Sequence, residues 1–364
     1  MMLGLRGFPG VQGGVETHAE HLCPLLVELG CEVTVLTRAP YHPRGIGDAW
    51  KGVRFVPLWA PRSKGLEAIL HSFLGVVYAA WKRPDILHIQ AIGPGLMTLP
   101  ARLFGLRVVV THHGPDYDRQ KWGRFAKWVL RKGERIGMRW SQGRIVISEV
   151  IRGLVREMHG RESTLIPNGV LLPDLPSTTS TLEKFGLEHG RYVLLVSRLV
   201  PEKRHFDLIK AFKNVSLSGW KLAIVGASDH PDDYVRNLLD EAAATPGVVC
   251  TGLQTGLALS ELYTHAGIFV LPSSHEGLPI AMLEALSYGL PVVASDIPAN
   301  LEVGLPADHY FPLGKVKALA GCLAHFAQVP QTTEMREVRR QWVSTRYDWR
   351  DIARRTLAVY REIA

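Results

Sequence analysis

The chain has 364 residues, 46% of them hydrophobic, which supplies cores for two domains and excludes a disordered protein. Its four cysteines lack metal-site spacing and predict buried thiols in a reducing compartment. Residues 1–170 carry 23 Lys and Arg against 13 Asp and Glu, whereas residues 171–364 carry 19 against 21. The basic first half indicates an anionic partner, which charge alone leaves open among nucleic acid, a phospholipid surface and a phosphorylated substrate.

The first half alternates short apolar runs with helical stretches, which predicts a parallel, doubly wound α/β sheet. The chain begins directly in an apolar run, so we expect no signal peptide. The most apolar helical stretch, residues 66–81, is too short and too polar to span a bilayer. The expected strands are residues 2–5, 32–36, 53–58, 86–89, 108–111 and 144–147.

A glycine-rich loop follows the first strand. Gly10, Gly13 and Gly14 precede a helix expected near Val15, and glycines there let the backbone approach a diphosphate without a side-chain clash. Their spacing differs from the dinucleotide pattern G-x-G-x-x-G, which argues against NAD. A plain tight turn is the alternative interpretation.

Two histidines, His112 and His113, follow the strand at residues 108–111. A histidine at the end of a parallel strand faces the crevice where ligands bind, and there it can donate a hydrogen bond to a sugar hydroxyl or stabilise charge near a reacting carbon. A structural histidine is the alternative. We prefer His113 over His112 because Gly114 follows it.

A helix expected over residues 119–140 has two different faces. One carries five cations, and the opposite one carries apolar residues that we expect to face the core. The basic face includes an aromatic residue, Trp128, a combination that suits anionic lipid headgroups, although an ordinary amphipathic helix is also possible. The cations are Arg124, Lys127, Arg131, Arg135 and Arg139, and the apolar residues are Trp122, Phe125, Val129, Ile136 and Trp140.

The alternation restarts after a Pro-, Ser- and Thr-rich linker at residues 171–181, which predicts a second Rossmann-like domain. Arg198 and Lys203 follow its first strand, and two cations there can neutralise a departing diphosphate without a metal. The expected strands are residues 192–197, 221–225, 248–250, 268–271 and 292–294.

The most informative stretch is residues 268–296, which reads as strand, polar loop, helix and strand. Glu276 lies in the loop and Glu284 lies eight residues later in the helix, so both can face one crevice. The helix start near Gly277 offers backbone N–H groups to an anion, and carboxylates accept hydrogen bonds from sugar hydroxyls. Hydroxyls at two places with phosphate between them is the layout of a nucleotide-sugar.

This stretch, EGLPIAMLEALSYGLPVVAS, resembles the Glu–seven residues–Glu motif of retaining glycosyltransferases of family 4, which have the GT-B fold. The resemblance covers nearly the whole chain and implies two Rossmann-like doubly wound parallel-sheet domains facing across a cleft. It implies an N-terminal acceptor-side domain at residues 1–170, a nucleotide-sugar-binding domain at 171–346 and a terminal helix at 347–364 that packs back on the first domain.

The resemblance also implies roles for single residues. In the family the residue at Glu276 contacts the donor sugar, that at Glu284 the nucleotide ribose, and the Arg198 and Lys203 pair the diphosphate. The cleft histidine corresponds to His113, and the family usually has glycine where this chain has Arg204. Backbone contacts to the donor are implied for Gly13, Gly14, Gly252, Leu253, Gly277 and Leu278.

The run GPDYDRQKWGR contains a D-x-D triplet, Asp116 to Asp118, which holds a divalent metal in GT-A glycosyltransferases. Because that fold has one nucleotide-binding domain and this chain has two, we predict no metal site and no other cofactor. The run resembles a subgroup of family 4. The acceptor-side candidates are Glu16, Asp116, Arg119, Lys121 and Trp122.

We therefore predict a metal-independent, retaining, hexosyltransferase-type enzyme that uses a nucleoside-diphosphate sugar. Its acceptor would be a lipid-linked or growing glycan in cell-surface polysaccharide synthesis, and the enzyme would be cytoplasmic and peripherally bound to an anionic membrane through the helix at residues 119–140. The alternatives are a non-catalytic nucleotide-sugar or nucleic-acid binder and a GT-B nucleotide-sugar epimerase. Because no nucleic-acid-binding motif is recognisable, we expect no nucleic-acid partner.

Overall fold

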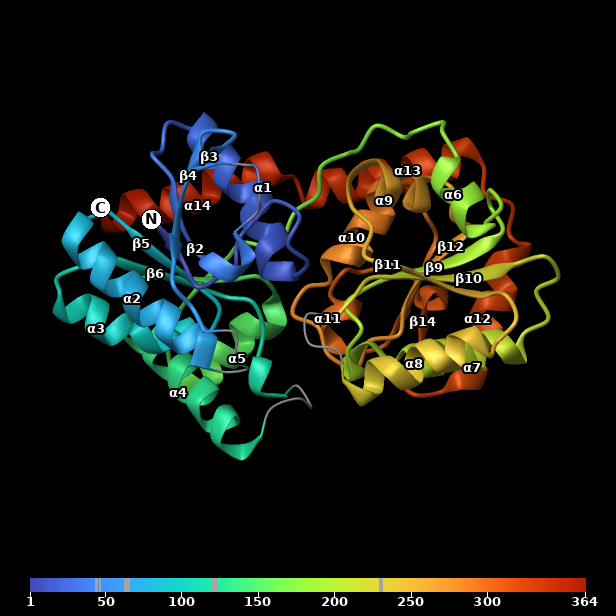
Figure 1. Ribbon diagram of the computed structural model, residues 1–364, viewed down its shortest axis with the longest axis horizontal. Coiled ribbons are helices and arrows are strands. Elements are labelled where there is room, and N and C mark those ends of the chain that lie inside the picture. Colours follow the sequence, from blue (N-terminus) through green and yellow to red (C-terminus); the bar gives the residue numbers. More distant parts are fainter. Residues whose placement is uncertain (43–44, 46, 62–65, 119–122, 229–231) are drawn as a thin grey trace. The chain divides into compact units, whose positions relative to one another are not determined.

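The protein is described by a computed structural model, in which the described residues are 1–364 without 43–44, 46, 62–65, 119–122 and 229–231. The chain forms two compact units (Figure 1). Unit 1 comprises Met1–Gly169 together with Trp349–Ala364, and unit 2 comprises Val170–Asp348. The last helix of the chain therefore belongs to the first unit.

Unit 1 is built on one eight-stranded sheet in the order β3-β4-β2-β1-β5-β6-β7-β8, in which only the β3–β4 pair is antiparallel. Helices α1 and α14 pack together on one face, and α2, α3 and α4 lie in succession on the other (Figure 1). The strands are β1 Met2–Leu3, β2 Thr34–Arg38, β3 Ala49–Trp50, β4 Val53–Leu58, β5 Leu87–Gln90, β6 Val108–His112, β7 Gly143–Val146 and β8 Thr164–Leu165. The helices are α1 Gly14–Glu28, α2 Leu66–Lys82, α3 Thr98–Leu103, α4 Arg124–Trp140, α5 Glu149–His159 and α14 Trp349–Ile363, with short 3-10 turns η1 Ala39–Tyr41, η2 Pro94–Met97 and η3 Asp116–Asp118.

Unit 2 is built on a six-stranded, wholly parallel sheet in the order β11-β10-β9-β12-β13-β14. Its strands are β9 Tyr192–Val196, β10 Lys221–Val225, β11 Val248–Gly252, β12 Ile268–Leu271, β13 Val292–Ser295 and β14 Tyr310–Phe311. Its helices are α6 Ser180–Phe185, α7 His205–Asn214, α8 Asp233–Ala243, α9 Gly256–Thr264, α10 Ile280–Ser287, α11 Pro298–Leu301, α12 Val316–Gln328 and α13 Thr333–Arg346, with 3-10 turns η4 Pro201–Lys203 and η5 Ala307–His309.

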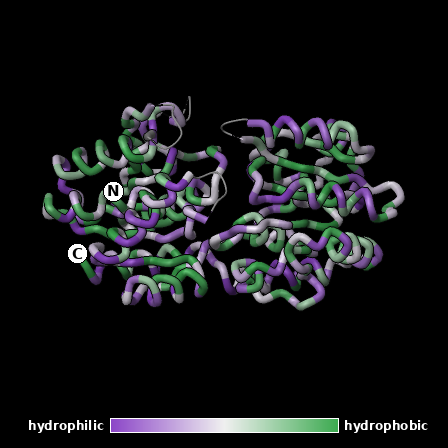
Figure 2. Tube along the Cα trace, turned by 90° about the horizontal axis from the view of Figure 1, so that it is seen from below, coloured by the Kyte–Doolittle hydropathy of each residue, from purple (hydrophilic) through white to green (hydrophobic). Residues whose placement is uncertain are grey.

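The hydrophobic strands make the cores of both units, and hydrophobic segments run through their interiors (Figure 2). All predicted strands are present, and β4, β10 and β12 have the predicted ends. The sequence missed β3, β8 and β14, which have two residues each and give too short a pattern to detect. The predicted α/β fold class with two parallel-sheet domains is confirmed.

The prediction for the buried face of α4 was wrong. Phe125 and Trp140, which we expected in the core, are 76% and 49% exposed. The buried line is instead Gly133, Glu134, Gly137 and Met138, because the two glycines let α4 approach the backbone of η2 closely: a Cβ on Gly95 in η2 would lie 2.9 Å from the Gly133 carbonyl oxygen. Small residues, not the aromatic ones, make this contact.

The predicted bounds of α4 can be checked only in part. The described helix begins at Arg124, and its predicted beginning at residues 119–122 lies outside the described residues.

None of the helices in the described ranges has both the length and the apolar character needed to cross a bilayer.

Candidate functional site

In each sheet the strand order reverses once, and the loops on both sides of that point meet at the carboxyl edge of the sheet. In unit 2 the reversal lies between β9 and β12, which are hydrogen-bonded neighbours. In unit 1 it lies between β1 and β5. Open α/β folds bind ligands at this place, because the following helices leave to opposite faces and open a crevice.

In unit 2 the reversal brings together two predicted residues that are far apart in the sequence. The Nζ atom of Lys203, after β9, lies 2.5 Å from Oε1 of Glu276, after β12. Their side chains are 16% and 12% exposed, so the protein shields most of the ion pair from solvent while leaving part of it accessible to a ligand. An ammonium has three N–H donors, and Glu276 uses one of them.

A backbone contact holds these two loops in register. Ser274 donates from both its backbone N–H and its hydroxyl to the carbonyl oxygen of Glu202, at 2.8 and 3.2 Å. His205 ties the other end of the same loop, with Nε2 3.0 Å from the Ser197 hydroxyl and Nδ1 2.9 Å from the Tyr234 hydroxyl. Burial lowers the pKa of His205 to about 3, so it makes these bonds as a neutral ring.

Arg204 occupies a backbone conformation that favours glycine. Its φ is 52° and its ψ is 43°, in the left-handed region, and its Nε atom lies 2.5 Å from Oδ2 of Asp207. The turn from η4 into α7 requires that conformation, which glycine adopts without strain. Arg204 adopts it despite the strain that its Cβ causes.

The helix after the Glu276 loop begins at Ile280, within one residue of the predicted Pro279, and it carries Glu284. Oε2 of Glu284 accepts a hydrogen bond from the Tyr263 hydroxyl at 3.1 Å. The Tyr263 ring stacks on Tyr288 with centroids 5.0 Å apart, so an aromatic pair packs beside this carboxylate.

The remaining donor-side candidates lie on the loops of the same unit. Arg198 follows β9 and is half-buried, Gly252 ends β11 with φ of 73°, and the Leu253 side chain is 45% exposed. Gly277 and Leu278 belong to the loop between β12 and α10. All of them therefore follow carboxyl ends of unit 2 strands, as the strand pattern predicts.

In unit 1 the glycine-rich loop is fixed by an ion pair. Glu16 is buried, its Oε1 lies 3.1 Å from Nε of Arg6, and Arg6 also donates to the carbonyl oxygen of Gln12. A Cβ on Gly13 would overlap this carboxylate, and Gly14 begins α1. Burial alone would raise the pKa of Glu16, but the charge and hydrogen bonds of Arg6 hold it below its usual value. The structure thus places Glu16 in a contact that shapes the loop.

The two histidines after β6 have different surroundings. His112 is fully buried, with Nε2 2.7 Å from Oε1 of Glu134 and Nδ1 accepting from the Gly114 N–H at 3.1 Å. His113 is partly exposed, and its Nε2 lies 2.7 Å from Oε1 of Gln90, the last residue of β5. Both ring nitrogens of His112 are therefore occupied within the protein, whereas His113 reaches the surface of unit 1.

The D-x-D triplet forms η3, where Tyr117 is buried and its hydroxyl donates to Oε1 of Glu134 at 3.3 Å. Within the described ranges, no three His, Cys, Asp or Glu side chains are grouped as metal ligands would be. The acceptor-side candidates Arg119, Lys121 and Trp122 lie outside the described residues, so the structure places only Glu16 and Asp116 of that set.

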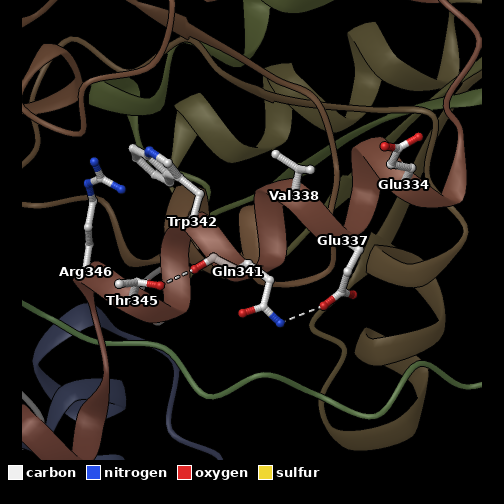
Figure 3. Close-up of a pocket in the computed structure, with 7 residues that line it drawn as sticks. All are labelled: Glu334, Glu337, Val338, Gln341, Trp342, Thr345 and Arg346. Carbon is white, nitrogen blue, oxygen red and sulfur yellow. Dashed lines mark hydrogen bonds between the residues drawn. The ribbon is translucent and has the colours of Figure 1, made fainter.

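A surface hollow of about 590 Å³ lies along α13 and uses none of the predicted residues (Figure 3). Several of its side chains are bound to their own helix: Gln341 donates to Glu337 at 2.8 Å and Thr345 to the Gln341 carbonyl at 2.7 Å. The Arg346 guanidinium lies over the Trp342 ring at 4.5 Å. We do not assign this hollow to the sites at the sheet edges.

Comparison with known sequences covers both units. Residues 13–169 match the family described as Glycosyl transferase 4-like domain, and residues 179–329 match the family Glycosyl transferases group 1. The chain is a family 4 glycosyltransferase. The predicted family is therefore confirmed. Lys203 and Glu276, which form the ion pair of unit 2, both lie within the second matched range, residues 179–329.

The glycosyltransferase is 25% identical to a phosphatidyl-myo-inositol mannosyltransferase of Mycobacterium leprae over 97% of this chain and 94% of the relative. It is 23% identical to TuaC of Bacillus subtilis, a glycosyltransferase assigned to teichuronic acid biosynthesis, over 75% of this chain and 74% of that one. The solved structure of HepE from Anabaena in complex with UDP-glucose matches with a TM-score of 0.81 at 16% identity, over 99% of both chains. That structural likeness shows the GT-B fold.

Some residues of the glycosyltransferase that organise these loops were missed in the sequence. Gln90, Ser274, His205 and Tyr263 each hold a candidate side chain or its loop. Gln90 left a detectable signal, because an amide directly after the predicted buried strand at residues 86–89 indicates a polar contact at that edge of the sheet. The other three carried no pattern that distinguishes them from ordinary loop and helix residues.

Proposed function

We propose that the protein transfers a sugar, with retention of configuration, from a nucleoside-diphosphate sugar to a hydroxyl of a lipid-linked or growing glycan. The observation that supports this best is the contact of Lys203 with Glu276 at the strand-order reversal of unit 2. A cation for diphosphate and a carboxylate for sugar hydroxyls within one hydrogen bond of each other suit two adjacent parts of a nucleotide-sugar, the diphosphate and the sugar attached to it.

In the proposed reaction the bond from the anomeric carbon to the diphosphate breaks, and the acceptor oxygen bonds to the same face of that carbon. The acceptor proton passes to an oxygen of the leaving diphosphate. Arg198 and Lys203 stabilise the charge that develops on this leaving group, which is the work a metal does elsewhere, so we propose that no metal is needed. Glu276 orients the sugar and Glu284 the ribose.

Unit 1 would contribute the remaining groups. The Gly13–Gly14 backbone can approach the diphosphate, because Arg6 and Glu16 hold the loop in one shape. His113 is proposed to contact the sugar, since the ring nitrogens of His112 are already bonded. Asp116 follows in η3 and is proposed to contact the acceptor.

The acceptor class draws on the named relatives. The M. leprae relative is a mannosyltransferase named for a phosphatidyl-myo-inositol lipid, and TuaC is assigned to teichuronic acid, a glycan. We extend these classes to this chain and propose a role in the synthesis of a bacterial polysaccharide or glycolipid, on the cytoplasmic side of the membrane.

The exposed side of unit 1 suggests how such an acceptor is reached. Phe125 and Trp128 on α4 are exposed and stacked, with ring centroids 6.0 Å apart, among exposed cations. On α2, Phe73, Val77 and Trp81 are 51%, 45% and 72% exposed at four-residue spacing, and so form one stripe. Aromatic and basic side chains together bind the interface of an anionic bilayer, so we propose that α2 and α4 rest on it reversibly.

A binding screen followed by product analysis tests the proposed function. The chain should be stabilised by nucleotide-sugars, for which UDP-glucose, UDP-galactose and GDP-mannose are the first probes; a ligand at about 100 times its dissociation constant raises the unfolding free energy by ~2.7 kcal/mol. With the donor found, NMR of the product should show the donor's anomeric configuration retained. Inversion would refute retention, and a free epimerised nucleotide-sugar would favour the epimerase. Binding without hydrolysis or transfer would favour a non-catalytic binder.

A further inference from the structure

Gln90 and His113 form a contact that neither the family matches nor the sequence pattern assigns. Gln90 ends β5, where every residue is buried, and its side chain is fully enclosed. Its Oε1 lies 2.7 Å from Nε2 of the partly exposed His113 on the neighbouring strand end. The buried amide therefore meets the one ring nitrogen of His113 that faces the protein interior.

The neighbours of Gln90 decide which way its amide points. Its Nε2 lies 3.2 Å from the Met2 sulfur and 3.3 and 3.4 Å from the two ring nitrogens of His88. A thioether has no hydrogen to donate, so an amide oxygen in that place would face an acceptor without a partner. The NH₂ group therefore belongs beside Met2, and the oxygen belongs beside His113.

His88 is itself held in place from two sides. Its Nδ1 lies 2.6 Å from the Tyr360 hydroxyl of α14, and its Nε2 lies 2.6 Å from the Thr111 hydroxyl of β6. His18 of α1 packs edge-on against the His113 ring, with centroids 4.9 Å apart. The contacts around Gln90 thus come from β1, β5, β6, α1 and α14, which leaves the amide little freedom to turn over.

The orientation of Gln90 fixes the proton on His113. An amide oxygen only accepts, so Nε2 of His113 must carry the hydrogen. Burial lowers the pKa of His113 to about 3, helped by the nearby rings of His88 and His112, and the ring is therefore neutral near pH 7. A neutral imidazole has one N–H, so Nδ1 carries a lone pair. Within the described part of the chain no hydrogen bond reaches Nδ1.

We propose that Gln90 is a positioning residue that holds His113 in the Nε2–H tautomer, so that Nδ1 accepts a hydrogen bond from a hydroxyl of the donor sugar. This reverses the expectation from the sequence that His113 donates to the hydroxyl. The tautomer is independent of the proposed function, and only the identity of the ligand rests on it.

NMR of the ¹⁵N-histidine-labelled, full-length protein without ligand tests the tautomer. Long-range proton–nitrogen spectra should show Nε2 of His113 as the protonated nitrogen and Nδ1 as the bare one, with His113→Gln identifying the signals. Gln90→Glu keeps the acceptor and should keep this pattern, whereas Gln90→Met removes it and should move both nitrogens toward averaged values. A wild-type spectrum with the proton on Nδ1 overturns the proposal, even if Gln90→Met does not fold. An unchanged Gln90→Met spectrum also overturns it.

Binding of UDP-glucose and GDP-mannose tests the ligand. Gln90→Met should weaken the donor that binds wild type by about fivefold to tenfold, the scale of one neutral hydrogen bond, with a smaller change in kcat than in KM. Gln142→Met is the matched control, because Gln142 accepts a hydrogen bond from the Val108 N–H at the opposite end of β6 at 2.7 Å. It should change neither the His113 spectrum nor donor binding.

The outcomes separate the two claims. Loss of the tautomer in Gln90→Met with unchanged donor affinity would overturn the contact between His113 and the sugar. Equal weakening by Gln90→Met and Gln142→Met would show a general structural effect and overturn the positioning role. A wild-type protein that binds no nucleotide-sugar refutes the proposed function and leaves the spectrum as the test of the tautomer.

Discussion

The two units hold their candidate sugar-contacting residues, His113 and Glu276, by different means. In unit 2, charge does so: Lys203 and Glu276 form an ion pair between loops that follow two adjacent strands. In unit 1, neutral hydrogen bonds do so: His113 contacts Gln90, and Gln90 in turn contacts Met2 and His88. An ion pair survives over a wide pH range, but a network of neutral histidines exists only while its rings stay unprotonated. Unit 1 should therefore be the part that acid, and changes to buried polar residues, disturb first.

Acid should give the largest difference between the units. Five histidines of unit 1 have pKa values lowered chiefly by burial, against three of the described histidines of unit 2, His189, His205 and His309. Since the folded pKa lies below the unfolded value of 6.5, each ring's stabilising contribution is complete above pH 6.5 and falls as pH drops toward the folded pKa. Because unit 1 holds more of these rings, its free energy of unfolding should fall more than that of unit 2 between pH 7 and pH 5. The five are His18, His21, His71, His88 and His113.

Hydrogen exchange of the full chain between pH 7 and 5 measures this, and β5 and β6 should lose protection at a higher pH than β9 and β12. His71→Leu should lower the pH at which unit 1 opens, while His325→Leu, at an exposed position, should not. Simultaneous opening of both sheets would contradict the contrast between the units.

The two units should also differ in how strongly they bind an anionic membrane. Changing Arg124, Lys127, Arg131 and Arg135 to Gln should weaken binding to anionic vesicles by about 4 kcal/mol, at roughly 1 kcal/mol for each cation. Co-sedimentation at low salt measures this, and 1 M salt should abolish the wild-type binding because the Debye length falls to about 3 Å.

The matched control changes four exposed lysines of unit 2 to Gln. This variant should pellet like wild type, since unit 2 lacks the basic excess of unit 1. If wild type and the α4 variant pellet equally, α4 is not the membrane surface. The four lysines are Lys184, Lys210, Lys213 and Lys317.

The charge-based site of unit 2 should respond strongly to loss of one cation. Lys203→Ala or Arg198→Ala should lower the rate of sugar transfer about 100-fold, the scale of a lost electrostatic contact in a transition state. Lys213→Ala removes a more exposed lysine, paired with Glu241 at 3.2 Å, and should leave the rate unchanged. Circular dichroism should show both proteins folded; an unfolded Lys203→Ala would mean that the ion pair with Glu276 is structural.

The strained turn at Arg204, beside this site, predicts a smaller effect, on stability: glycine should be more favourable than alanine at this position. Arg204→Gly should be more stable than Arg204→Ala by about 1 kcal/mol, because only glycine adopts the left-handed conformation without strain. At Lys210, inside α7, the order should be reversed by a similar amount. Thermal or urea unfolding measures both pairs, and the same order at the two positions would contradict the strain.

The smallest expected effect is that of removing metal. Sugar transfer should survive EDTA, because Arg198 and Lys203 are proposed to stabilise the leaving diphosphate. The activity assay before and after chelation decides this. Loss of transfer that Mg²⁺ or Mn²⁺ restores would instead make Asp116 and Asp118 metal ligands.

The sequence determined the strands, the fold class and most of the donor-side candidates of unit 2. These features are local: β12, its loop and α10 form one continuous stretch, and residues 268–271 carry the apolar run of a buried strand. Glu276 and Lys203 could be expected near each other because both follow carboxyl ends of parallel strands. Their 2.5 Å contact still required the strand order β9-β12, which no local pattern contains.

Only the tertiary structure decided the surroundings of His113 and the buried face of α4. Met2, His88, Gln90, His113 and Tyr360 meet because β1, β5, β6 and α14 pack together, and a hydrogen bond between distant residues leaves no periodic signal in the chain. The helical pattern of α4 predicted an aromatic core face, but close backbone packing at Gly133 and Gly137 buries a different side of the helix, between the aromatic and the basic residues. Periodicity shows how residues divide around a helix, and the shape of its neighbour decides which side is buried.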